Sequence, residues 1–245
     1  MIREQETILY ANRFSNRAAN YLKFRPAYHP EVLAFMQQSM GLKTTHNIVD
    51  IGSGTGRFAK LLLQNGYRVT GVEPNDDMRE TAEKDLAGFQ NFTSIAGSAE
   101  DTGLQSSSAD LVVVAHAFHW MDIDAAREEF HRILRPGGKI MLAWIIRQTN
   151  SDFLLRYEQL KKQFRAKQVP PLIDEEKIRA FYGPGVVQQI SFLHNSWVNF
   201  DGLKGLLLSS SGIPLPGHAQ YDTMISSLVQ LFVAHNENGF VNVGY

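Results

Sequence analysis

The segment Ile48-Val49-Asp50-Ile51-Gly52-Ser53-Gly54-Thr55-Gly56 decides the fold of this chain. An apolar run ends at an acidic residue and passes directly into a loop with glycine at every second position. Residues 57–63 then carry apolar side chains at helical spacing. A strand, a tight loop and a helix in this order are typical of the first unit of a doubly wound α/β domain. Glycine suits the loop because the backbone turns sharply where a ligand must approach it closely.

The spacing of the glycines narrows the class of ligand. A dinucleotide-binding loop reads G-x-G-x-x-G, and its third glycine lets the helix pack closely on the strand. Here the pattern is G-x-G-x-G, and Arg57 stands where that third glycine would be. The spacing therefore disfavours an NAD(P)-dependent oxidoreductase, which is the main alternative with the same fold.

The composition is that of an ordinary globular protein. The 245 residues are 44% hydrophobic and 20% charged, and 24 Lys and Arg against 25 Asp and Glu leave a net charge of -1. This balance disfavours a nucleic-acid partner, because phosphate binding draws on clustered Lys and Arg. The absence of cysteine excludes disulfides, thiolate nucleophiles and Cys-ligated metals. No apolar run has membrane-spanning length and residues 1–7 lack the order of a signal peptide, so a cytoplasmic location without membrane association is expected.

Strands and helices alternate downstream of the loop. Strands are predicted at 68–73, 92–96, 110–115 and 139–146, with helices between most of them. The segment 110–115 contains an unbroken apolar, β-branched run, which is typical of a strand buried on both faces. Five strands within roughly 100 residues predict a mostly parallel sheet with right-handed crossovers.

The domain organisation is predicted as one domain over residues 1–245. Its core would comprise about 46–146 and 188–245, where residues 239–245 begin a last strand at which the sequence given ends. Helices in about 1–45 and 150–185 would form a cap over this core.

Several segments together resemble the class I S-adenosylmethionine (SAM)-dependent methyltransferases of the type 11 kind, including trans-aconitate methyltransferase-like proteins. The resemblance implies a seven-stranded, Rossmann-like sheet with an antiparallel last strand. It also implies SAM as methyl donor, S-adenosylhomocysteine as product and a small-molecule acceptor. Oligomeric state stays open. The segments that carry the resemblance are the glycine loop, Glu73, and the residues 21–30, 97–104, 115–120 and 134–138.

The resemblance implies contacts to the methionine and ribose parts of SAM. Glu73 would accept both ribose hydroxyls, because an ionised carboxylate offers several lone pairs. Pro74 and Met78 would flank the adenine, although Met78 is equally consistent with a core residue. Tyr21 and Arg25 belong to an N-terminal lead-in, where the guanidinium fork of Arg25 suits the methionine carboxylate. The loop contributes Asp50, Gly52, Ser53 and Gly54.

Two further segments complete the predicted donor site. Ser98 stands where many of these enzymes carry an Asp that binds the adenine amino group, with Ala99 offering the next backbone N–H. A neutral hydroxyl binds more weakly than a carboxylate, so adenine affinity is lower or Glu100 takes part. Carbonyls at Ala115 and His116, where the fourth strand ends, can receive the methionine ammonium group.

His119 is the predicted catalytic residue. Its near-neutral pKa suits a general base, and a role in shaping the pocket wall is equally open. His116 and His119 are three apart, but no Glu-x-x-His pattern accompanies them, so no metal site is predicted. The sequence favours methyl transfer to a small molecule, with a carboxylate as one option. Two alternatives stay open: a SAM-binding protein without catalysis and the oxidoreductase.

Overall fold

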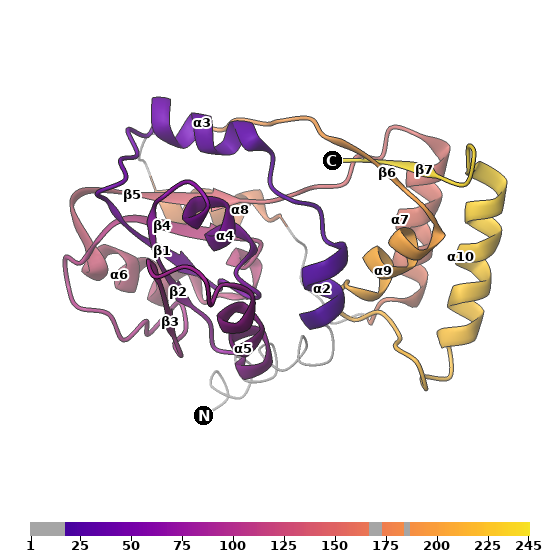
Figure 1. The fold of residues 1–245 in the computed structure, drawn as a ribbon, viewed down its shortest axis with the longest axis horizontal. Helices are drawn as coiled ribbons and strands as arrows, with labels where there is room; N and C mark the ends of the chain where they lie inside the picture. Colours follow the sequence, from indigo (N-terminus) through magenta and orange to yellow (C-terminus); the bar gives the residue numbers. More distant parts are fainter. Residues whose placement is uncertain (1–17, 167–172, 184–186) are drawn as a thin grey trace. The chain divides into compact units, whose positions relative to one another are not determined.

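The computed structural model describes residues 18–166, 173–183 and 187–245 (Figure 1). They form two compact units. The first comprises 27–144 together with the described part of 170–192, and the second comprises 18–26, 145–166 and 193–245. Within these ranges, no helix combines the length and the apolar character that crossing a bilayer requires.

The first unit is built on a five-stranded sheet with the order β3-β2-β1-β4-β5. All four pairings are parallel, so the carboxyl ends of the strands meet at one edge. The central strand β1 pairs with β2 on one side and β4 on the other, which places the topological switch point at its end. The strands are β1 (Asn47–Ile51), β2 (Arg68–Val72), β3 (Phe92–Ile95), β4 (Ala109–Ala115) and β5 (Leu134–Ala143).

Helices cover both faces of this sheet, as Figure 1 shows. Alternate residues of β4 point to opposite faces: Leu111 and Val113 pack in one hydrophobic cluster, Val112 and Val114 in the other. The first cluster includes α3 (Pro30–Gln38) and α4 (Arg57–Leu63), and the second includes α6 (Ile123–Ile133) and α8 (Glu175–Tyr182). The other helices among the described residues of this unit are α5 (Asp76–Asp85) and the short 3₁₀ helix η2 (Phe118–Trp120).

Residues 135–138 form a local irregularity within β5. Ala109 pairs with Leu134, but Leu111 already pairs with Lys139, so the intervening residues bulge away from β4. Gly137 has a left-handed φ of 80°, which suits this departure from the ladder.

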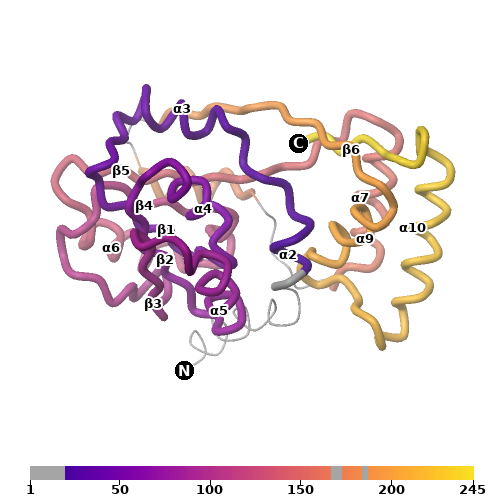
Figure 2. The backbone as a smooth tube through the Cα atoms, in the orientation of Figure 1, coloured from indigo at the N-terminus to yellow at the C-terminus, as the bar shows by residue number. Residues whose placement is uncertain are grey.

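The second unit is helical with a small sheet. Its core is formed by α7 (Asp152–Phe164), α9 (Phe200–Leu208) and α10 (Tyr221–His235), with α2 (Ala18–Phe24) packed on α9. The strands β6 (Asn195–Val198) and β7 (Val241–Gly244) pair antiparallel with each other. Figure 2 lets the reader follow the chain from β5 of the first unit into α7 of the second.

The doubly wound, mostly parallel sheet is confirmed, whereas the seven-strand count is wrong. The main sheet has five strands, because β6 and β7 pair only with each other among the described strands. Val241 and Val243 of β7 are buried in the helical core of the second unit. This core, and not the edge strand β5, is what β7 packs against. The assignment of residues 1–245 to a single domain stays a prediction, beside the two compact units observed here.

Candidate functional site

The glycine loop follows β1 at the switch point of the sheet. Gly52, Gly54 and Gly56 have φ angles of 65°, 56° and 76°, all in the left-handed region that non-glycine residues avoid. The amides of Gly52 and Ser53 both donate to the carbonyl of Val72, at 2.8 and 3.2 Å. The loop is therefore bent back onto the end of β2.

Neighbouring side chains press closely on the loop. A Cβ on Gly52 would lie 2.4 Å from Cβ of Ala117, and one on Gly56 would lie 2.6 Å from Cδ1 of Leu86. A Cβ on Gly54 would meet only Cε of Met78, at an ordinary 3.6 Å. Two of the three glycines are thus required by close packing as well as by φ, while the space beside Gly54 is more open.

Glu73 holds the loop to the end of β2. Its buried carboxylate accepts the amide of Gly54 through Oε2 at 2.8 Å and the amide of Asn75 through Oε1 at 2.9 Å. Burial raises its pKa, and these two amides oppose the shift. A carboxylate has about four lone-pair sites, so Glu73 keeps acceptor capacity for a further ligand. Asn75 then caps α5 by accepting the amide of Met78 at 2.9 Å.

Asp50 lies directly beneath the loop and is completely buried. Neither carboxylate oxygen has a hydrogen bond of normal geometry among the described residues. Burial raises its pKa to about 8, opposed by the amide of Ala59 in the first turn of α4 and assisted by the charge of Glu73. That amide lies near enough to stabilise the charge but makes no well-formed hydrogen bond, so we treat the carboxyl as unsatisfied. A buried acid in this state favours a cationic group beside it.

The segment after β3 forms a tight turn around Ser98. The Ser98 hydroxyl oxygen accepts the amides of Glu100 and Asp101, both at 3.2 Å, which uses its acceptor capacity. A contact of Ser98 with a base would therefore use its hydroxyl proton. Oε1 of Glu100 accepts the amide of Asp122 at 3.0 Å. Ala99, between Ser98 and Glu100 in the sequence, is buried.

An ion pair between the buried Glu129 and the partly exposed Arg132 fixes this turn to α6. Oε1 of Glu129 accepts both the amide of Thr102 at 2.9 Å and its hydroxyl at 2.5 Å. Arg132 donates to both oxygens of Glu129, at 2.6 and 2.7 Å. The hydrogen bond from Arg132 is the largest influence on Glu129 and lowers its pKa to about 2. The predicted adenine segment thus rests on a charge-assisted network.

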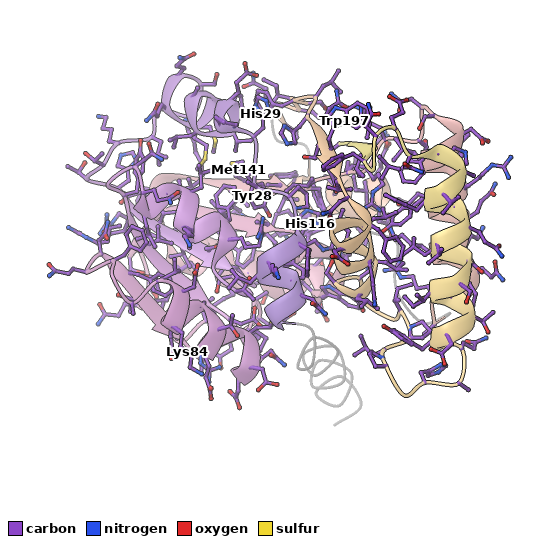
Figure 3. The ribbon with its side chains drawn as sticks, turned by 45° about the vertical axis from the view of Figure 1, so that its right-hand side comes forward. Tyr28, His29, Lys84, His116, Met141 and Trp197 are labelled. Atoms are coloured by element: carbon purple, nitrogen blue, oxygen red, sulfur yellow. The ribbon has the colours of Figure 1, made fainter. Side chains whose placement is uncertain are left out.

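The end of β4 carries a strained histidine. His116 has a φ of 62°, a left-handed conformation that is uncommon for a non-glycine residue, and its amide donates to the carbonyl of Ala143 at 2.9 Å. Ala115 before it is the last residue of β4. Figure 3 shows His116 near Tyr28, and their ring centroids lie 6.3 Å apart. Tyr28 packs edge-on against Phe58 of α4, at 4.8 Å.

His119 and two indoles follow at the same strand ends. His119 lies in η2, half-buried, with its ring 4.7 Å from that of Trp120. Trp144, immediately after β5, packs edge-on against Phe118 at 6.2 Å. The indole N–H of Trp144 is buried and has no hydrogen-bond acceptor within the part of the chain that the structure describes.

The lead-in segment is divided between the two units. Tyr21 and Arg25 belong to the second unit, where the Arg25 guanidinium lies 5.1 Å from the Tyr21 ring and donates to the carbonyl of Ser209 at 3.4 Å. Tyr28 belongs to the first unit and contacts the strand-end residues described above. The structure thus brings together part of the predicted set of the first unit, namely Asp50, Gly52, Ser53, Gly54, Glu73 and Met78, while Pro74 beside them is exposed.

Comparison with known proteins identifies the first unit. Residues 49–142 match the family model described as a methyltransferase domain. They contain the parallel sheet, the glycine loop and the strand ends. Residues 49–142 are therefore assigned to a class I methyltransferase domain.

Related sequences agree with this methyltransferase domain. An uncharacterized methyltransferase of Mycobacterium tuberculosis is 32% identical over 131 residues, which cover 54% of this chain and 51% of that protein. The chain thus spans about half the length of such curated relatives. An uncharacterized methyltransferase of Schizosaccharomyces pombe is 26% identical over 223 residues and is matched over 88% of both chains.

Solved structures share the fold of the methyltransferase domain. The YcgJ protein of Bacillus subtilis has a TM-score of 0.58 at 19% identity, covering 88% of this chain and 94% of that one. A proposed type II methyltransferase from Anaeromyxobacter dehalogenans has a TM-score of 0.63 at 19% identity, covering 90% and 94%. At this level of identity the likeness shows the fold.

Sequence reasoning missed several residues of the strand-end region of the methyltransferase domain. Asn75 carried a usable signal, since an Asn before an acidic first turn is a typical N-cap. Trp144 carried none. Tyr28 and Ala117 lie in segments that carry the resemblance, but their contacts join distant segments and could not be predicted.

Proposed function

We propose that this chain transfers the methyl group of SAM to a small-molecule acceptor. One observation carries the proposal: Glu73, at the end of β2, is joined to the glycine loop by the 2.8 Å bond from the Gly54 amide. This bond places a carboxylate with spare lone pairs beside a loop in which every second residue is glycine. A ribose with two adjacent hydroxyls fits such a carboxylate.

The chemistry of the remaining residues fits the same ligand. The methionine part of SAM carries an ammonium group and a sulfonium, and Asp50 is a buried acid without a well-formed hydrogen bond in the described residues. Met78 and Pro74 lie beside Gly54 and Glu73, where an adenine face would pack. Ser98 would donate its hydroxyl proton to a ring nitrogen, since its lone pairs serve Glu100 and Asp101.

The reaction asks the protein mainly to align two reactants. When bound, SAM supplies a methyl carbon on a sulfonium, so the acceptor atom forms the new bond as the carbon–sulfur bond breaks and neutral S-adenosylhomocysteine leaves. Holding reactants in line can contribute roughly 7–11 kcal/mol. His119, half-buried in η2, would take the proton of a hydroxyl or amine acceptor. A carboxylate acceptor needs no base.

One observation favours the second candidate, a SAM-binding protein without catalysis. The hydroxyl oxygen of Ser98 already accepts two amides of its own turn. The adenine would therefore be bound more weakly than by a carboxylate at this position. Detection of turnover with any acceptor decides between these two candidates.

The first experiment measures S-adenosylhomocysteine binding by titration calorimetry. Glu73→Ala should weaken binding at least about tenfold, because a charge-assisted hydrogen bond is lost. Asp110→Asn is the matched control: Asp110 lies at the start of β4, at the opposite edge of the sheet, and pairs with Arg135. Binding of NAD instead of S-adenosylhomocysteine, or an unchanged affinity in Glu73→Ala, would contradict the proposal.

The second experiment identifies the acceptor. Labelled SAM is incubated with a panel of small carboxylic acids and phenols, and transfer of label to an extractable product is measured. Transfer to any member shows catalysis. Tight S-adenosylhomocysteine binding without transfer to any acceptor class would favour the non-catalytic candidate.

A further inference from the structure

The second unit buries a charge cluster that the proposed methyl transfer does not use. Arg147 and Lys161 share one carboxylate: Nη1 of Arg147 lies 2.6 Å from Oε1 of Glu158, and Nζ of Lys161 lies 3.0 Å from each oxygen. The side chains of Arg147 and Lys161 are only 10% and 18% exposed. Two largely buried cations are therefore balanced by a single anion.

One further cation, Arg25, lies near this cluster. Arg25 of the same unit lies near enough for its charge to act on Lys161 and on Tyr157. Burial and the neighbouring charge of Arg147 lower the pKa of Lys161 to about 8, so the ammonium is already partly destabilised. A buried ammonium whose charge is only partly offset by a neighbouring carboxylate is costly. A further anion would lower that cost.

Tyr157 supplies a polar group within the same cluster. The residue is fully buried, and its hydroxyl has no hydrogen-bond partner among the described residues. The Arg147 guanidinium packs over its ring with Cζ 4.6 Å from the centroid, and Nζ of Lys161 lies 5.9 Å from the same centroid. Nε of Arg147 is likewise buried without an acceptor in those residues. Two unsatisfied donors beside excess positive charge select an anionic acceptor over a neutral one.

We propose that Arg147, Tyr157 and Lys161 bind the carboxylate of a small organic acid in the second unit. One excess positive charge among these side chains and Glu158 matches a singly charged oxyanion. A guanidinium N–H and a phenol O–H can each donate to one of the two carboxylate oxygens. Glu158, whose side chain is 33% exposed, connects the cluster to solvent.

The test uses the full chain, without SAM, and propionate as the probe. Titration calorimetry at constant ionic strength should show saturable binding of propionate and none of propionamide, its uncharged analogue. Inorganic phosphate is the third ligand. Phosphate binding without propionate binding, equal binding of propionamide, or no saturable heat with propionate would each overturn the proposal.

Tyr157→Phe separates a ligand site from a structural ion pair. It removes a hydroxyl that makes no hydrogen bond to the described residues, so the unliganded protein should keep its thermal midpoint. Propionate affinity should fall about tenfold, the value of one hydrogen bond to a charged group. Unchanged affinity would overturn the role of Tyr157.

Two further variants guard this result. Tyr67→Phe is the control, because that buried hydroxyl accepts a hydrogen bond from Gln37 in the first unit, and its loss should leave propionate binding unchanged. Arg147→Lys keeps the positive charge but loses the planar guanidinium group with its paired N–H donors, and it should also lower the affinity for propionate. The binding assay contains neither SAM nor S-adenosylhomocysteine. Its result therefore does not depend on whether the protein transfers methyl groups.

Discussion

Asp50 is predicted to make the stability of the protein depend on pH. Its pKa in the folded protein is raised from 3.8 to about 8, first by burial. The fold is therefore favoured while the carboxyl is protonated, and the free energy of unfolding should fall as pH rises between these two values. Above about pH 8 both the folded and unfolded states carry the charge, and the loss levels off.

The size of the effect follows from the shift. At about 1.4 kcal/mol per pKa unit, the change from 3.8 to about 8 corresponds to about 6 kcal/mol at high pH, of which about 4 kcal/mol is present at pH 7. Asp50 is completely buried, so solvent screening removes little of this energy. Such a cost is a large fraction of the stability of a typical domain.

Asp50→Asn removes the titration while keeping the shape of the side chain. Urea unfolding of both proteins between pH 5 and pH 9 should show the variant gaining stability over the wild type as pH rises. At the acid end, the neutral amide and the protonated acid should differ least. Curves that stay parallel over the whole range would refute the reasoning, because they would show that Asp50 does not titrate between the folded and unfolded pKa values.

The same residue couples pH to the proposed donor. A cation beside Asp50 favours its ionised form, so binding below about pH 8 should release a proton. Wild-type affinity for SAM should rise with pH up to that point, and the affinity of Asp50→Asn should change less.

Two other substitutions test the geometry of the first unit. Gly52→Ala should destabilise the fold in urea by at least about 1 kcal/mol more than Gly66→Ala. Both positions have left-handed φ, but only a Cβ at Gly52 collides with a neighbour, Cβ of Ala117 at 2.4 Å. Equal losses of stability would show that the loop accommodates the methyl group without cost. His119→Ala should leave S-adenosylhomocysteine affinity intact and slow turnover about 100-fold if His119 is the base. Unchanged turnover would assign it to the pocket wall.

The glycine loop and Glu73 are the parts of the site that could be predicted from local sequence. The glycines of the loop are required by left-handed φ angles that follow from its sharp bend. Glu73 comes at the end of an apolar strand, where side chains of a parallel sheet gather at one edge. These features were predictable because strand periodicity and glycine spacing act over a few residues.

The pairing of distant strands could not be predicted in this way. The last two strands, β6 and β7, are each four residues long, and nothing in their sequences indicates which strand each of them pairs with. Their pairing with each other depends on burial of Val241 and Val243 among helices that lie far apart in sequence. The role of Ser98 as the centre of its own turn is likewise decided by the backbone path after β3.

The two units bury ionisable groups of opposite kinds, acids in the first and bases in the second. In the first unit, Asp50 and Glu73 are buried acids whose pKa values are both raised, a state that a cationic ligand relieves. In the second, Arg147 and Lys161 are buried around one carboxylate, a state that an anion relieves. A sulfonium donor and an organic acid are the ligands that these charges would select. Carboxylic acids are the first members of the acceptor panel to try, because their methylation would need no general base. His119→Ala would then leave turnover of an acid unchanged while slowing that of a phenol, which separates the two acceptor classes in one enzyme.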